Sequence, residues 1–270
     1  MTDAPSSVAW RAETALPAPT QNLKLLIAYD GTDFRGFAAQ AGQRTVQSEL
    51  TSALQQLWPT PSEPLRLTCA GRTDAGVHAW GQVVNVRAPA DADPERARHA
   101  LNRMLAPEIV VRRCEPVADD FDARYSAKWR RYRYTIVNQR DPDPFLARYA
   151  WWVHESLDVA RLRLAADPFV GEHDFASFCR KGPQGSTTVR RVFESYWLDD
   201  AESDDGVLTY EIRASAFCWQ MVRAIVGTIV DAAAGKLRPG DILPVLRAGN
   251  RQAAGRLAPP QGLCLWQVGY

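Results

Sequence analysis

The sequence predicts an α+β fold of two domains, each with a mainly antiparallel sheet flanked by helices. Short apolar or alternating runs typical of strands are separated by segments whose apolar residues recur every three or four positions, as in helices. In the first half these segments come in the order strand, helix, strand, strand, helix, strand, which is the order of a split βαβ unit. A chain of 270 residues with 46% hydrophobic residues can bury a core in each domain.

The expected domain boundary lies near residues 117–120, after the last strand of the first half. The composition of the chain changes little at this point. We place the domains at 23–118 and 119–270. The segment before them, residues 1–22, is rich in Ala, Pro, Ser and Thr and has no periodicity. Such a segment cannot bury enough apolar surface to fold, and we expect a disordered tail.

The first domain opens with an apolar strand at Leu23–Tyr29, which ends at an Asp-Gly turn. Thr45 can cap a helix that runs to about Trp58, because apolar residues follow it at helical spacing. A second helix is expected over Pro94–Met104, with Asp93 as its cap. The remaining strands of this domain are expected at 65–70, 82–86 and 109–115.

The second domain opens with a strongly alternating strand at Trp129–Val137. In this strand Tyr132 and Tyr134 share one face, and the arginines between them share the other. Ala216–Gly235 is typical of a long apolar helix, and 262–268 of a final strand. Further strands are expected at 189–198 and 207–214, and further helices at 157–166 and 239–248.

Composition excludes several classes of protein. No apolar run reaches the roughly 20 residues of a membrane-spanning helix, and the N-terminal segment lacks the apolar core of a signal peptide, so a cytoplasmic protein is expected. The five cysteines are scattered without a CxxC pair, which indicates reduced thiols. The four histidines show no ligand spacing, and we expect no metal site.

Basic residues are concentrated in two stretches, although the net charge is only +1. Residues 123–140 and 180–191 contain several arginines and lysines and no acid. Such stretches can neutralise the phosphates of a nucleic acid. The alternative is that they are solvated faces of strands.

The segment Arg72-Thr73-Asp74-Ala75-Gly76 is the best candidate for chemistry. It forms a Gly-punctuated loop between two expected strands, where reactive groups commonly lie. An arginine close to an aspartate favours the charged carboxylate, which suits a nucleophile or a cation stabiliser better than a general acid. The alternative is that Asp74 caps its own turn and that Arg72 is a surface residue.

Two further residues have both a functional and a structural interpretation. Tyr132 is placed to stack on an unpaired base from the face of a sheet, but it can equally pack in the core. Arg223 is an isolated cation in an apolar helix, so it must either reach water or meet an anion.

Four blocks of the chain resemble the tRNA pseudouridine synthase A family. The string from Arg72 to His78, RTDAGVH, matches the family signature, and YDGTDFRGFAAQ, RYRY with MVR, and the closing GLCL match further blocks in the same order. The chain departs from the family pattern at Phe37, where a tryptophan is usual, and at Trp219-Gln220, where histidines are usual. The resemblance runs from about Leu23 to the last residue.

The resemblance implies an enzyme that converts uridine to pseudouridine in the anticodon stem-loop of tRNA, at positions 38 to 40. It implies that Asp74 is the catalytic nucleophile, that Tyr132 contacts the target base, and that Arg223 pairs with Asp74. Arg72 and Leu263 are further candidate substrate-binding residues. The resemblance also implies an active-site cleft between the domains, no cofactor, and a homodimer.

Two other functions remain open from the residues themselves. A non-catalytic RNA-binding protein would use the basic stretches and aromatic side chains, and loss of Asp74 would change only its stability. A nucleoside hydrolase would attack a glycosidic carbon with Asp74, and such enzymes normally need a second carboxylate or a metal. Asp30 or Asp33 would provide the carboxylate only if the fold brought their loop close to Asp74.

Overall fold

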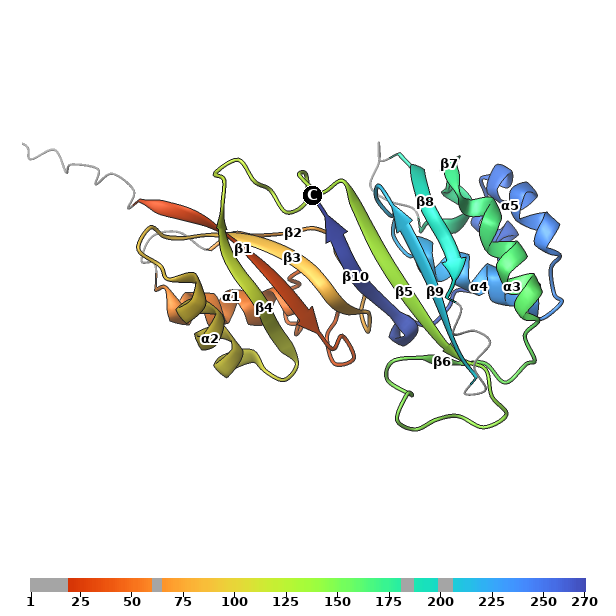
Figure 1. Cartoon of the computed structure of the whole chain (residues 1–270), viewed down its shortest axis with the longest axis horizontal. Coiled ribbons are helices and arrows are strands. Elements are labelled where there is room, and N and C mark those ends of the chain that lie inside the picture. The colour runs from red at the N-terminus through yellow and green to blue at the C-terminus, as the bar shows by residue number, and fades with distance from the viewer. Residues whose placement is uncertain (1–18, 60–64, 181–186, 199–205) are drawn as a thin grey trace, which may run out of the picture.

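The computed structural model describes residues 19–59, 65–180, 187–198 and 206–270. One twisted sheet of ten strands runs through the molecule (Figure 1). The strands are β1 (Thr20–Tyr29), β2 (Leu67–Cys69), β3 (His78–Pro89), β4 (Ile109–Val117), β5 (Trp129–Val137), β6 (Trp151–Trp152), β7 (Gly171–Asp174), β8 (Val189–Trp197), β9 (Val207–Ala214) and β10 (Leu263–Gly269). The α-helices are α1 (Val46–Leu57), α2 (Pro94–Leu105), α3 (Val159–Ala166), α4 (Met221–Ala233) and α5 (Ile242–Ala248).

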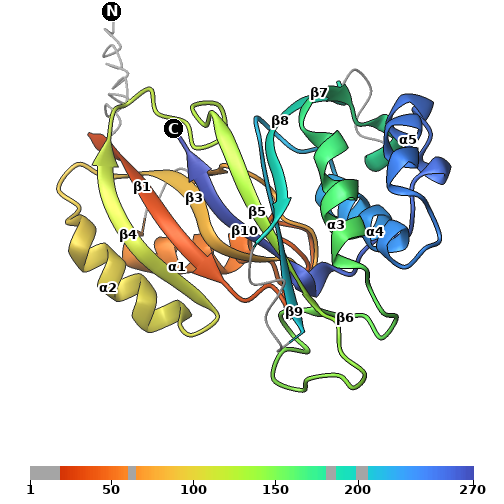
Figure 2. The same cartoon turned by 45° about the vertical axis from the view of Figure 1, so that its right-hand side comes forward.

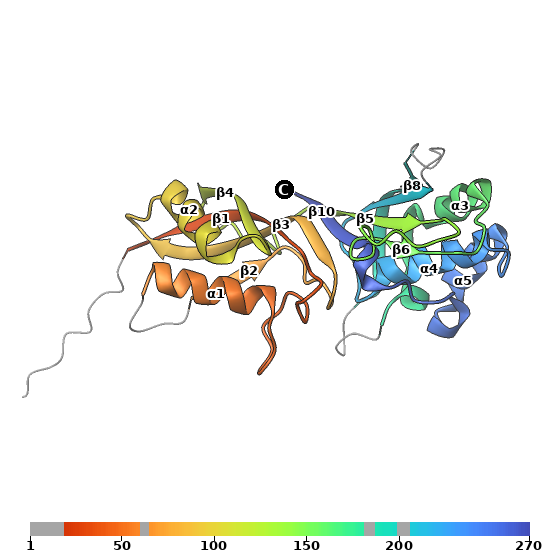
Figure 3. The same cartoon turned by 90° about the horizontal axis from the view of Figure 1, so that it is seen from below.

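The α+β class and the mainly antiparallel pairing predicted from the sequence are confirmed. The sheet order is β4-β1-β3-β10-β5-β9-β8-β7, with β2 paired to β3 and β6 paired to β5. Helices α1 and α2 lie at one end of this sheet, and α3, α4 and α5 lie at the other (Figure 2). Seen from below, α1, α4 and α5 lie on the same side of the sheet (Figure 3).

Strand β10 joins the two halves of the chain in the middle of the sheet. It pairs in parallel with β3, with Cys264 opposite His78, and antiparallel with β5, with Leu263 opposite Tyr134. The first-half and second-half sheets are thus continuous with one another. The domain boundaries at 23–118 and 119–270 stay a prediction.

Several element boundaries differ from the sequence-based prediction, and two of them concern the cleft and the expected tail. Helix α4 begins at Met221, because the preceding residue, Gln220, has the left-handed backbone angle φ 63°. Strand β1 begins at Thr20, within the expected tail, and the amide of Gln21 donates to the carbonyls of Pro89, Ala90 and Ala92. The rest of the expected tail, residues 1–18, lies outside the described residues.

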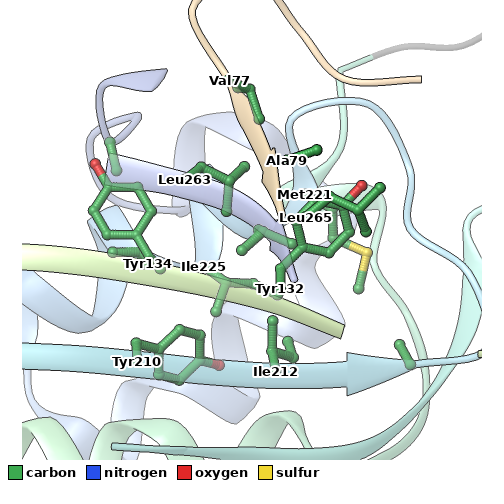
Figure 4. Packing of buried hydrophobic residues seen from close by; sticks show 14 of the residues in the cluster. Val77, Ala79, Tyr132, Tyr134, Tyr210, Ile212, Met221, Ile225, Leu263 and Leu265 are labelled. Carbon is green, nitrogen blue, oxygen red and sulfur yellow. The ribbon is translucent and has the colours of Figure 1, made fainter. Parts of the chain in front are cut away.

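The core lies between the sheet and the helices that cover it. Tyr132 and Tyr134 point from β5 into this core (Figure 4). Ile136 is buried in the same core, as the alternation of the strand predicts. Twelve of the 13 residues of α4 are buried, so this helix is apolar almost all round and packs inside the second half. The hydroxyl of Tyr134 donates to the carbonyl of Pro259 at 2.8 Å, which satisfies it within the core.

The opposite face of the sheet carries aromatic rings interleaved with arginines, and we call it the aromatic-arginine face. Trp80 stacks on Trp266, with ring centroids 5.8 Å apart, and the Arg133 guanidinium lies 3.9 Å above the Trp266 ring. Trp80 and Phe193 are more than one third exposed. This face consists of Trp80, Trp129, Arg131, Arg133, Phe193, Arg213 and Trp266.

Glu211 is a buried carboxylate that pairs with two arginines of the aromatic-arginine face. Its side chain is 1% exposed and accepts hydrogen bonds from Arg133 at 2.8 Å and from Tyr196 at 2.6 Å, and Arg131 lies 3.4 Å away. Burial alone raises the pKa of this carboxyl, but the two hydrogen bonds and the arginines outweigh it and hold the pKa below its usual value. Glu211 is therefore ionised at neutral pH.

Candidate active site

The loop that follows β1 holds the Asp74 loop through two backbone hydrogen bonds. The backbone N–H of Phe37 donates to the carbonyl of Thr73 at 3.0 Å, and that of Gly76 donates to the carbonyl of Phe34 at 3.3 Å. Gly36 has φ 94°, and a Cβ atom there would lie 2.9 Å from the Thr73 carbonyl oxygen. The contact between the two loops therefore requires a glycine at this position.

Phe37 occupies a core position although it departs from the family pattern. It is 1% exposed, and its ring lies 6.3 Å from that of Tyr29. Together with the hydrogen bond to Thr73, this packing anchors the first loop against the second. A phenylalanine thus fills this core position, where a tryptophan is usual in the family pattern.

A buried polar network fixes the backbone on both sides of Arg72. The amide of Gln82 donates to the carbonyl of Gly71 at 2.6 Å and to the hydroxyl of Tyr29 at 3.5 Å. The Tyr29 hydroxyl is hydrogen-bonded to that of Thr73 at 2.8 Å. Burial raises the pKa of Tyr29, so the phenol stays protonated and can donate to Thr73.

Arg223 and Asp74, which are 149 residues apart in the chain, form an ion pair. The Arg223 Nη1 lies 3.5 Å from the Asp74 Oδ2, and the Arg223 Nε donates to the carbonyl of Ala258 at 2.7 Å. The Arg223 side chain is 12% exposed, whereas that of Asp74 is 38% exposed. The guanidinium is thus fixed inside the protein. The carboxylate is partly exposed to solvent, and the buried Arg223 guanidinium balances its charge.

Tyr132 comes from strand β5, which β10 separates from β3, the strand that follows the Asp74 loop. Its side chain is 8% exposed, and its ring contacts that of Phe217 edge to face at 5.0 Å. Burial, and secondly the negative charge of Asp74, raises the pKa of the phenol. Tyr132 therefore presents a neutral aromatic ring next to the carboxylate.

These residues share one cleft of about 510 Å³, a volume typical of a ligand pocket. Asp74, Tyr132 and Leu263 line it, and Asp74 is the only acidic residue among its lining residues. Burial lowers the pKa of Arg130, and its guanidinium donates five hydrogen bonds to four backbone carbonyl oxygens. The arginines that line the cleft are Arg72, Arg124, Arg130, Arg180 and Arg190.

The structure corrects the expected partner of Asp74 within its own loop. Arg72 lines the cleft and is exposed, and among the described residues the ion pair to Asp74 comes from Arg223. Asp30 and Asp33 do not provide a second carboxylate in the cleft, because their partners are His78, Tyr149 and Arg148 instead. The geometry therefore lacks the carboxylate pair of a glycoside hydrolase.

Sequence reasoning missed several residues that shape the site. Phe217 and Trp219 line the cleft from the segment before α4, and Gln82 acts from the middle of β3. Phe217 carried no sequence signal beyond its place before α4, and Trp219 was noted only as a departure from the family pattern. No group of three or more His, Cys, Asp or Glu side chains within the described residues could hold a metal ion. No helix in that part of the chain is long and apolar enough to cross a membrane.

The fold and the cleft define a class of protein: an α+β protein in which one carboxylate, one buried tyrosine ring and five arginines line a single cleft. A family profile described as tRNA pseudouridine synthase matches residues 25–126 and 165–270. The chain is 44% identical over 248 residues to "tRNA pseudouridine synthase A" of Bacillus licheniformis, covering 92% of this chain and 98% of that one. It is 42% identical over 265 residues to the protein of the same name from Leifsonia xyli, covering 92% and 91%. The chain belongs to the tRNA pseudouridine synthase family.

Proposed function

We propose that this protein converts uridine to pseudouridine in tRNA with Asp74 as its nucleophile. The observation that carries the proposal is the Asp74–Arg223 pair beside Tyr132 in a cleft lined by five arginines. The family profile and the relatives named "tRNA pseudouridine synthase A" support the reaction and the substrate. The reaction itself breaks the bond from N1 to C1′, turns the base, and forms a bond from C5 to C1′.

The three residues divide the work of this isomerisation. Arg223 orients the Asp74 carboxylate, whose side chain stays 38% exposed. Tyr132 offers a flat neutral surface to the base, and Leu263 forms an apolar wall of the same cleft. The base exchanges its C5 proton for a proton at N1, so the reaction is balanced without an oxidant or reductant.

The arginines of the cleft serve the RNA backbone. A uridine in a stem must leave the base stack to reach Asp74, which costs a few kcal/mol. Ionic contacts between phosphates and Arg72, Arg124 or Arg190 would offset this cost. We assign the substrate uridines to positions 38 to 40 of the anticodon stem-loop, as the resemblance of the four sequence blocks implies.

The aromatic-arginine face supports a homodimer in the cytoplasm, where tRNA is found. Exposed aromatic rings next to both arginines and the carboxylate of Glu194 make a face that is complementary to itself. Trp266→Ala together with Trp80→Ala would remove the stacked pair of this face. Sedimentation at micromolar concentration should then give a monomer for the double variant and a dimer for the unchanged protein; a monomer in both cases would refute the dimer.

Release of the C5 hydrogen from unmodified tRNA carrying tritium at C5 of uridine tests the reaction. The unchanged protein should release tritium, and Asp74→Asn, which keeps the shape of the side chain, should release none while binding the same tRNA. Free uracil would instead indicate a hydrolase. Binding without release by the unchanged protein would leave an RNA-binding protein.

A further inference from the structure

Trp219 is a large aromatic side chain exposed at the active-site cleft. It lines the same cleft as Asp74 and Tyr132, yet 49% of its surface is open to solvent, whereas Tyr132 is 8% exposed. Trp219 therefore lies toward the mouth of the cleft and Tyr132 in its wall. A tryptophan exposed in this way leaves a broad ring surface without a partner in the described part of the chain.

The backbone holds Trp219 in place from both sides. Its carbonyl accepts a hydrogen bond from the N–H of Arg180 at 2.9 Å, which ties the segment before α4 to the segment after Phe178. The next residue, Gln220, has φ 63°, a left-handed conformation that is strained for a residue other than glycine. Strain of this kind persists where the surroundings fix the backbone, and it is common at functional sites.

The burial of α4 explains why this position, and not one inside the helix, carries the ring. Almost every residue of α4 is buried, and Arg223 is engaged with Asp74. The two α4 residues that line the cleft, Met221 and Val222, are buried, so neither presents an exposed surface there. The turn at Gln220 puts Trp219 just outside the helix while keeping it on the cleft.

The surroundings of Trp219 fit a nucleotide. Arg180 and Arg190 line the cleft with it, and the Nε of Arg190 is buried without a hydrogen-bond partner among the described residues. A phosphate would supply the missing acceptor, and a base attached to that phosphate could stack on the indole. Every base has a face that can stack, so this contact would hold a nucleotide whatever its identity.

We propose that Trp219 is a stacking platform for the unpaired base that flanks the target uridine on the same strand. The proposal rests on the proposed function, because it places the target uridine itself against Tyr132 and Asp74. Trp219 does not touch the reacting atoms and acts by holding the opened strand. Its loss therefore weakens the binding of the RNA more than it slows the isomerisation of bound RNA.

The test compares Trp219→Ala and Trp219→Phe with Trp152→Ala, a control at an exposed tryptophan of β6 outside the cleft. Trp219→Ala should raise the Kd for unmodified tRNA about 10- to 100-fold, as loss of one stacked base does. Trp219→Phe should recover most of this loss, and Trp152→Ala should leave the Kd unchanged. The single-turnover rate at saturating tRNA should change less than the Kd in the two Trp219 variants.

A fluorescent base provides the second readout. An RNA stem-loop with 2-aminopurine next to the target uridine should lose fluorescence when it binds the unchanged protein, and should stay bright with Trp219→Ala. An unchanged Kd, or equal quenching by both proteins, would overturn the proposal. Tritium release by the unchanged protein tests the proposed function separately. If the unchanged protein releases tritium, the proposed function stands, and only the stacking role of Trp219 has failed.

Discussion

Replacement of Arg223 by Gln tests whether the buried guanidinium supports the chemistry. The variant removes the charge that lies 3.5 Å from the Asp74 carboxylate and leaves a side chain that can still donate a hydrogen bond. At this distance Coulomb's law gives about 4.7 kcal/mol for an effective dielectric constant of 20, and about 1.2 kcal/mol for water. Because the Asp74 side chain is 38% exposed, a value between these limits, about 2 to 3 kcal/mol, is appropriate.

This energy corresponds to a fall of about 30- to 150-fold in the rate of the chemical step. The assay is tritium release in a single turnover, with Arg223→Gln in excess over tRNA so that binding does not limit the rate. Arg256→Gln is the matched control, since Arg256 pairs with Asp231 at 2.9 Å outside the cleft. Both variants lose a partly buried ion pair, but only the first should lose rate after correction for the folded fraction.

An unchanged single-turnover rate in Arg223→Gln would refute the role given to the ion pair. Asp74 would then hold its charge and orientation through solvent and its own loop, and the pair would be structural. A loss of rate in both variants by the same factor would point to stability instead of chemistry. Arg223→Lys adds a further comparison, because it keeps the charge but loses the fork that bonds Ala258 and Asp74 together.

Three other outcomes follow from contacts in the structure. A hydrogen bond from the Cys179 thiol lowers the pKa of Cys218, which lines the cleft. Iodoacetamide should therefore modify Cys218 before the other cysteines, and bound tRNA should slow this modification. Equal labelling of Cys218 with and without tRNA, measured by mass spectrometry, would contradict this prediction. Gly227→Ala should destabilise the protein by about 1 to 3 kcal/mol, because a Cβ would lie 1.8 Å from the Arg256 carbonyl oxygen, and a higher urea midpoint would contradict that contact. Glu211→Gln should cost about 3 to 5 kcal/mol at pH 7. Since the folded pKa of Glu211 is depressed, this difference should be present above about pH 4.3 and vanish as the pH falls further, and a Tm difference independent of pH would count against it.

Strong local periodicity made much of the fold predictable. The strand Trp129–Val137 has the predicted bounds because alternation of large side chains leaves only one register with Tyr132 and Tyr134 in the core. The start of α4 was not predictable in this way. Apolar spacing continues from Ala216 through Gln220 into α4. The helix nevertheless begins only at Met221, because Gln220 has a left-handed backbone angle.

The site was less accessible to local reasoning than the fold. Nearness in sequence suggested Arg72 as the partner of Asp74, but residues two positions apart in a loop need not face each other, and the partner comes from a helix 149 residues away. The family resemblance named that partner, whereas composition and spacing left it open. Gln82 was missed because a polar residue in an alternating strand is normally assigned to solvent, and only the fold shows that it supports the catalytic loop.

The insertion of β10 between β3 and β5 bears on how the enzyme reaches its base. Asp74 comes from the β3 side of this strand and Tyr132 from the β5 side. Backbone hydrogen bonds join β10 to β3 and β10 to β5. A jaw-like closure of the two halves would have to break those bonds. The protein therefore acts as a stiff template, and the work of deformation falls on the RNA. Stems that open easily at the target should be processed faster than rigid ones with the same sequence around the uridine.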